Sequence, residues 1–188
     1  LEEARSLGFE ILPPDVNKSQ PEFSVEKIGD KEYIRYALEA IKNAGAEGCL
    51  SIVQEREKNG PYTSLEDLCS RIDLFQANKK TIESLTKAGA LDSTAPNQDP
   101  KITRAHILAN IDNAVDMAHM VAKEKEKSTG NLFGDDFSSV LSIKQKAPVA
   151  AKPLTQNELL GYEKEVLGLY FSGHPMSKYQ SHLAQLHC

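Results

Sequence analysis

The sequence lacks any apolar run long enough to cross a membrane, and it contains only three cysteines. A membrane-spanning helix needs about 20 consecutive apolar residues, and no signal peptide is evident, so we expect a cytoplasmic protein without a membrane partner. Cys49, Cys69 and Cys188 are odd in number and widely spaced. They therefore predict reduced thiols rather than a disulfide framework or a zinc site.

The chain also has fewer basic than acidic residues. The chain carries 22 Lys and Arg against 27 Asp and Glu, a formal net charge of −5. A domain that binds DNA chiefly through bulk charge is usually strongly basic. Any contact with nucleic acid must therefore be local, and backbone amides at helix N-termini supply such a contact without a basic domain.

Motifs for catalysis are missing as well. The five histidines lack metal-ligand spacing, and no phosphate-binding loop or nucleophile motif is present. The pair Asp135 and Asp136 falls in a segment rich in Gly, Ser and Lys, with no third ligand nearby. We therefore expect neither a catalytic residue nor a metal or other cofactor in this chain.

The apolar pattern predicts a mainly helical fold with a small mixed N-terminal piece. Within residues 1–35, an apparent helix at Leu1–Arg5 is followed by strand-like runs, which lie at 9–12, 23–25 and 32–36. From Leu38 the apolar residues recur with the period of a helix, which places Leu38 and Ile41 on one face. The pattern breaks at Asn43–Gly45, and a second helix runs from about Leu50 to the stop at Asn59–Pro61.

Cap residues mark the helices that follow. Ser64 with Asp67 resembles a helix start, Asn78 caps a helix that stops at Gly89, and Thr155 with Glu158 forms a capping box. Residues 101–127 carry apolar side chains at spacings of three and four, as one long amphipathic helix does. Residues 128–154 are predicted to be a mobile linker, and residues 155–188 a helical extension with a last helix from Ser177.

The segment Ala40–Val53 is the most informative for function. Asn43 and Gly45 are expected to take positive φ in a tight turn between two helices, which frees amides at the start of the second helix for a phosphate. The alternative is an αα-corner that only packs a core. Glu47 places a negative charge beside the turn and counts against a phosphate.

The second candidate segment is Lys79–Leu91. Its single glycine, Gly89, is explained by helix capping alone. The pairing of two such turns with nearby basic side chains favours a contact with a nucleic-acid backbone, although scattered Lys and Arg are usually solvated surface. The candidate residues for this contact are Lys42, Asn43, Ala44, Gly45, Ala46, Gly48, Lys79, Lys80, Lys87 and Gly89.

Several short motifs occur in a fixed order along nearly the whole chain. They are Glu3–Gly8, Ile11–Asn17, Ile34–Leu38, the turn at Gly45, Gly60–Cys69, Asn78–Lys80, Lys87–Asp92, Asn131–Gly134 and Glu163–Pro175. In this order and spacing the chain resembles the alpha, or catalytic, subunit of bacterial DNA polymerase III. The family's hairpin usually reads Gly-Val-Gly where this chain has Asn43-Ala44-Gly45.

The resemblance implies a fold and a role. Residues 1–35 would end the fingers region, and residues 36–127 would form a tandem helix-hairpin-helix domain that holds duplex primer–template DNA. Residues 155–188 would lead toward an oligonucleotide-binding barrel outside this chain. The Mg²⁺-dependent polymerase residues would also lie outside, so the fragment itself would lack the catalytic residues of a DNA-directed DNA polymerase.

The implied partners are DNA, the other polymerase domains, and the sliding clamp and clamp loader, the last two through parts mostly outside this fragment. Leu132 and Phe133 resemble part of a clamp-binding peptide without its leading Gln. Two alternatives to DNA binding remain. The segment is a structural connector between the fingers and the C-terminal domains, or residues 128–154 bind the clamp or its loader.

Overall fold

A small sheet precedes the helices in the computed structural model, which describes residues 8–95, 98–128, 147–173 and 175. Strands β1 (Ile11–Leu12), β2 (Ser24–Ile28) and β3 (Lys31–Arg35) form a sheet in the order β1-β3-β2. β1 runs parallel to β3 and β2 antiparallel to it. The strand-like runs of the sequence are thus confirmed, and β2 extends further than predicted, to a two-residue turn at Gly29, whose φ is +62°.

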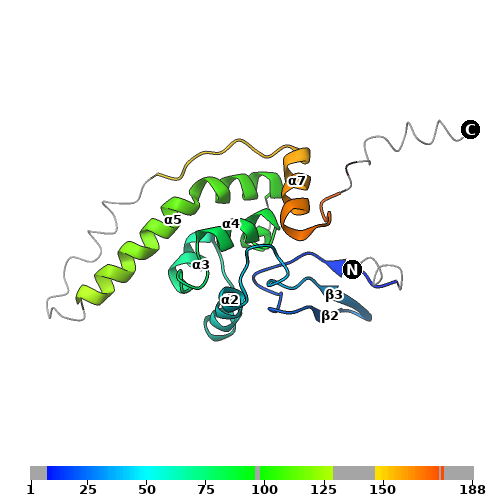
Figure 1. Ribbon diagram of the computed structural model, residues 1–188, viewed down its shortest axis with the longest axis horizontal. Coiled ribbons are helices and arrows are strands. Elements are labelled where there is room, and N and C mark those ends of the chain that lie inside the picture. Colours follow the sequence, from blue (N-terminus) through cyan, green and yellow to red (C-terminus); the bar gives the residue numbers. More distant parts are fainter. Residues whose placement is uncertain (1–7, 96–97, 129–146, 174, 176–188) are drawn as a thin grey trace, which may run out of the picture.

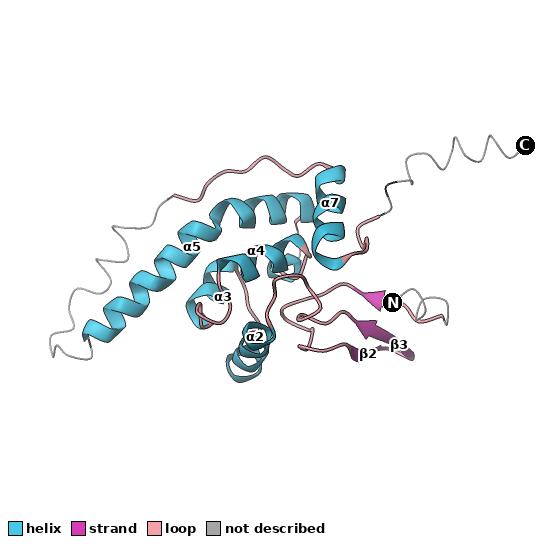
Figure 2. Cartoon of the chain, in the orientation of Figure 1, coloured by secondary structure: helices cyan, strands magenta, loops and turns pink. Residues whose placement is uncertain are grey.

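Beyond the sheet, the regular elements of the described chain are helices, which confirms the predicted fold class (Figures 1 and 2). Ser64 accepts a hydrogen bond from the Asp67 amide, Asn78 accepts two at the start of α4, and Thr155 and Glu158 form the predicted capping box. The helices are α2 (Ala46–Asn59), α3 (Leu65–Arg71), α4 (Lys79–Lys87), a 3-10 turn η1 (Asp92–Thr94), α5 (Pro100–Ser128) and α7 (Gln156–Leu167).

The predicted helix at Leu38 and Ile41 is wrong, because this stretch forms consecutive turns. The amide of Leu38 donates to Gln20 O, and that of Lys42 donates to Val166 O. Donors that an α-helix would use internally are therefore engaged by other segments. Leu38 and Ile41 are nevertheless fully buried, so the apolar spacing identified core residues without a helix.

The long helix α5 covers one side of α3 and α4, and the chain then returns along it (Figure 1). Asn110 of α5 holds this returning segment with two hydrogen bonds, one to the amide and one to the carbonyl of Val149, at 2.7 and 3.0 Å. Leu154 N donates to Lys101 O at 3.1 Å. Residues 147–154 are thus tied to α5 at two points before α7 begins.

One apolar core joins the helices to the sheet. Its fully buried members come from the turns before α2, from α2, α3 and α4, and from the loop after α4; they include Leu38, Ile52, Leu68, Ile82 and Leu91. Four further predictions fall wholly or largely outside the described residues: the helix at Leu1–Arg5, the mobile linker at 128–154, the motif Asn131–Gly134 and the helix from Ser177.

Candidate nucleic-acid interface

The first hairpin turn (Leu38–Gly45) is held against α4. Asn43 has the predicted positive φ, +66°, which Asn adopts at lower cost than most residues other than Gly. Its carbonyl accepts a hydrogen bond from Thr81 Oγ1 at 3.2 Å, and its Nδ2 donates to Ser84 Oγ at 3.4 Å. The turn and the first two turns of α4 therefore form one unit.

The predicted positive φ at Gly45 is wrong. Within Leu38–Gly45, positive φ occurs at Asn43 alone, and Gly45 has a φ of −43° and a ψ of 145° as the N-cap residue of α2. A Cβ added at Gly45 would meet no atom within 4 Å. Glycine at this position is therefore not required by the backbone or by packing.

The start of α2 differs from the start of α4 in how its amides are used. In the described part of the chain, no side chain caps α2. Asn78 Oδ1, in contrast, accepts hydrogen bonds from the amides of Lys80 and Thr81, at 3.0 and 3.2 Å. The first amides of a helix have no partner within it, and Ala46 and Glu47 are exposed, so the α2 N-terminus keeps donors directed at solvent.

The structure separates the ten predicted residues into an exposed and a buried set. The exposed residues are Lys42, Asn43, Gly45, Ala46, Lys79 and Lys80; Ala44, Gly48 and Gly89 are buried, and Lys87 is intermediate. Gly48 is explained by packing, because a Cβ there would lie 2.7 Å from Gln76 O.

Two of the four predicted lysines are engaged by carboxylates. Lys79 pairs with Asp112 of α5 at 2.5 Å, and this hydrogen bond raises the pKa of Lys79. Lys87 pairs with Glu83 at 2.9 Å and with Glu165 at 3.5 Å. Within the described ranges, Lys42 and Lys80 carry no ion pair, so of these four lysines they are the two whose charge no carboxylate neutralises.

The second hairpin turn (Ala88–Asp92) lies inside the protein. Gly89 has a φ of +83°, as the helix-capping prediction requires, and a Cβ there would lie 2.2 Å from a guanidinium nitrogen of Arg104. Ala90 O accepts a hydrogen bond from Val16 N at 2.9 Å. Arg104 in turn pairs with Asp92 and with the buried Glu163 of α7. That α7 covers the second hairpin turn could not be predicted from the sequence, because Glu163 lies in a run of charged residues.

Neither a metal cluster nor a membrane helix occurs in the described residues. No group of three or more His, Cys, Asp or Glu side chains converges there as metal ligands would. None of the helices described has both the length and the apolar content that a bilayer crossing demands.

Comparisons with known proteins agree with this arrangement. A family model described as a helix-hairpin-helix motif matches residues 8–100. The DNA polymerase III subunit alpha of Thermus aquaticus is 37% identical over 179 residues, which are 95% of this chain and 13% of that protein. The corresponding subunits of Xylella fastidiosa and Borreliella burgdorferi are 35% and 38% identical over 99% and 96% of this chain, and each match covers 15% of the relative.

The chain belongs to the DNA polymerase III alpha subunit family. The resemblance seen in the motifs is thus confirmed. Because the chain spans 13–15% of the length of these relatives, it corresponds to one segment of such a subunit.

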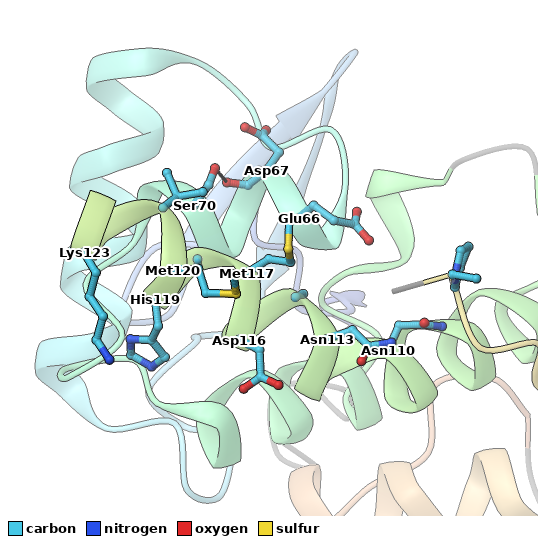
Figure 3. A pocket seen from close by; sticks show the side chains of 15 residues that line it. Glu66, Asp67, Ser70, Asn110, Asn113, Asp116, Met117, His119, Met120 and Lys123 are labelled. Carbon is cyan, nitrogen blue, oxygen red and sulfur yellow. Dashed lines mark hydrogen bonds between the residues drawn. The ribbon is translucent and has the colours of Figure 1, made fainter. Parts of the chain in front are cut away.

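In this polymerase III alpha segment, a groove separate from the hairpin turn lies between α3 and α5 (Figure 3). Met117 and Met120 of α5 line it together with Glu66 and Asp67 of α3, and Pro148 of the returning segment also contributes to the lining. None of the ten predicted backbone-binding residues lines this groove. It is therefore no part of the interface at the start of α2.

Proposed function

We propose that this segment binds the sugar–phosphate backbone of duplex DNA without sequence preference, within a DNA-directed DNA polymerase that acts in replication. The observation that carries the proposal is the uncapped N-terminus of α2, which leaves exposed amides beside Lys42. Helix N-terminal amides with the helix dipole favour a bound phosphate. Phosphates carry no base identity, so the contact is independent of sequence.

The contact is confined to a small surface. A chain with a net charge of −5 is not drawn to DNA by its overall charge. Glu47 in the first turn of α2 also opposes a phosphate, whereas Lys42 and Lys80 favour it. The expected affinity of the segment alone is therefore modest, and other domains of the polymerase would add to it.

The wider role follows from the family. We place the polymerase residues and their Mg²⁺ ions outside this segment, which itself needs no cofactor. Contacts with the sliding clamp and the clamp loader likewise belong mostly to other parts of the subunit, and the whole protein would act in the cytoplasm.

One observation favours the alternative role of structural connector. The second hairpin turn is covered by α7, and Lys87 is paired with Glu165 of that helix. This side of the segment therefore stabilises the domain rather than binding DNA. The proposed DNA contact is restricted to the first hairpin turn and the start of α4.

Fluorescence anisotropy with labelled duplexes tests the proposal. We expect the 188-residue chain to bind two duplexes of unrelated sequence equally at low salt. Lys42→Ala should weaken both by the same factor and reduce the slope of log K against log[salt] by about 0.9, the value for one phosphate contact. The control is Lys31→Ala, which removes an exposed lysine from strand β3. No binding by the parent chain, or equal effects of the two substitutions, would refute the proposal.

A further inference from the structure

Phe75 is the most exposed large apolar side chain of the described residues. It is 92% exposed, against 68% for Val25 and 49% or less for the others, such as Phe9 and Leu50. A single exposed apolar residue is ordinary on a protein surface. Phe75 differs because its ring is almost completely in water while the backbone that carries it is fixed.

The loop between α3 and α4 holds Phe75 outward. Asp73 Oδ1 accepts a hydrogen bond from Phe75 N at 2.9 Å, and Asp73 O accepts from Gln76 N and Ala77 N at 3.1 and 2.8 Å. Leu74 packs against the core on one side of Phe75, and Ala77 is fully buried on the other. Because the backbone is anchored on both sides of Phe75, little backbone conformational entropy is left to lose on binding.

The same loop and the helix that follows it adjoin the start of α2 and the first hairpin turn. A Cβ on Gly48 would lie 2.7 Å from Gln76 O, so the residue after Phe75 touches the first turn of α2. In α4, which begins directly after the loop, Thr81 Oγ1 donates to Asn43 O of the first hairpin turn. Phe75, the exposed Lys80 and the open amides of α2 are therefore carried by segments in direct contact.

We propose that Phe75 contacts the same duplex as the hairpin turn and lays its ring against deoxyribose and base edges. This inference rests on the proposed DNA binding. Apolar side chains such as Phe contact DNA at its base steps from the minor groove, and they need no positive charge to do so. Such a contact suits a chain with a net charge of −5, whose phosphate contacts are few.

The test compares Phe75→Ala with Lys42→Ala in the anisotropy assay, with circular dichroism as the check of folding. The loss of the apolar burial of a Phe ring that is partly covered by the duplex weakens binding about fivefold. Because no counterion is released at an apolar contact, Phe75→Ala should leave the salt slope unchanged, whereas Lys42→Ala should reduce it. Val25→Ala, which removes an exposed apolar side chain from strand β2, should bind as the parent does.

A second variant tests whether the loop between α3 and α4 faces the duplex, whatever the ring of Phe75 contributes to the affinity. Phe75→Lys should steepen the salt slope relative to Val25→Lys, a substitution with the same change in charge, if the loop faces the duplex. If neither Phe75 variant changes binding while Lys42→Ala weakens it, Phe75 faces another domain and the inference is overturned, although the proposed function stands. If the parent chain binds no duplex, the proposed function fails and this inference fails with it.

Discussion

Arg104 of α5 donates a 3.0 Å hydrogen bond to Glu163 of α7, whose side chain is fully buried. The same carboxylate accepts the amides of Phe171 and Ser172 at 2.8 and 2.9 Å. Arg104 also pairs with Asp92 at 2.7 Å. One buried network thus ties the C-terminal extension to the second hairpin turn.

Glu163→Ala should lower the free energy of unfolding by about 3–5 kcal/mol, because it leaves Arg104 buried with one of its charged partners removed. Urea denaturation followed by circular dichroism measures the loss. Glu165→Ala is the control, since this exposed carboxylate meets Lys87 at 3.5 Å and contributes about 0–1 kcal/mol. Equal effects of the two substitutions would show that the network does not stabilise the fold.

Gly48 and Gly45 lie three residues apart but should respond differently to a methyl group. Gly48→Ala should cost about 1–3 kcal/mol of stability, because its Cβ would lie 2.7 Å from the backbone oxygen of Gln76. Gly45→Ala meets no atom within 4 Å and should cost less, roughly 0.5 kcal/mol, because Ala is a poorer N-cap residue than Gly. If Gly48→Ala were as stable as Gly45→Ala, the tight packing of α2 on the loop after α3 would be contradicted.

Local signals in the sequence predicted most helix ends. A cap depends on one side chain and the next few amides, which is why Ser64, Asn78 and Thr155 could each be read without tertiary information. The apolar alternation of Glu32–Tyr36 likewise predicted β3. These features need only neighbours along the chain.

Features that depend on distant partners were missed. The apolar residues of 38–43 have the spacing of a helix, but the segment forms turns. The carbonyls of Gln20 and Val166 accept hydrogen bonds from amides of this segment. Glu163, within the charged run Glu163–Glu165, has the sequence pattern of an exposed residue, and its burial depends on Arg104, 59 residues away. A Phe after Asp73 and Leu74 is ordinarily taken as core, so the exposure of Phe75 gave no sequence signal either.

The thiols of Cys49 and Cys69 should be unreactive in the native protein. Burial raises the pKa of both to about 12, so at neutral pH almost no thiolate is present. In a Cys188→Ser variant, a thiol reagent such as DTNB should react only as fast as the chain opens, and two thiols should react at once in urea. Rapid reaction of two equivalents in native buffer would contradict the burial of these residues.

Substitutions at Gly45 test the amides of α2 directly. With a φ of −43° and a ψ of 145°, this N-cap position has an extended conformation that suits Asn and Asp, and their side chains accept hydrogen bonds from the next amides. Both Gly45→Asn and Gly45→Asp should therefore keep or slightly raise the thermal midpoint. Both should also occupy the donors proposed to hold a phosphate.

The two variants differ in charge, and this difference separates the loss of free amide donors from electrostatic repulsion of the phosphate. Gly45→Asn should weaken duplex binding because the donors are used, and Gly45→Asp should weaken it further because a carboxylate stands where the phosphate would bind. A charged hydrogen bond contributes about 1.5–3 kcal/mol, so a loss of roughly ten- to 150-fold is expected for the Asp variant. Anisotropy titrations at one low salt concentration give the order of affinities. If both variants fold normally and bind duplex as tightly as the parent, the amides of α2 hold no phosphate, and the first hairpin turn serves only to pack α2 against α4.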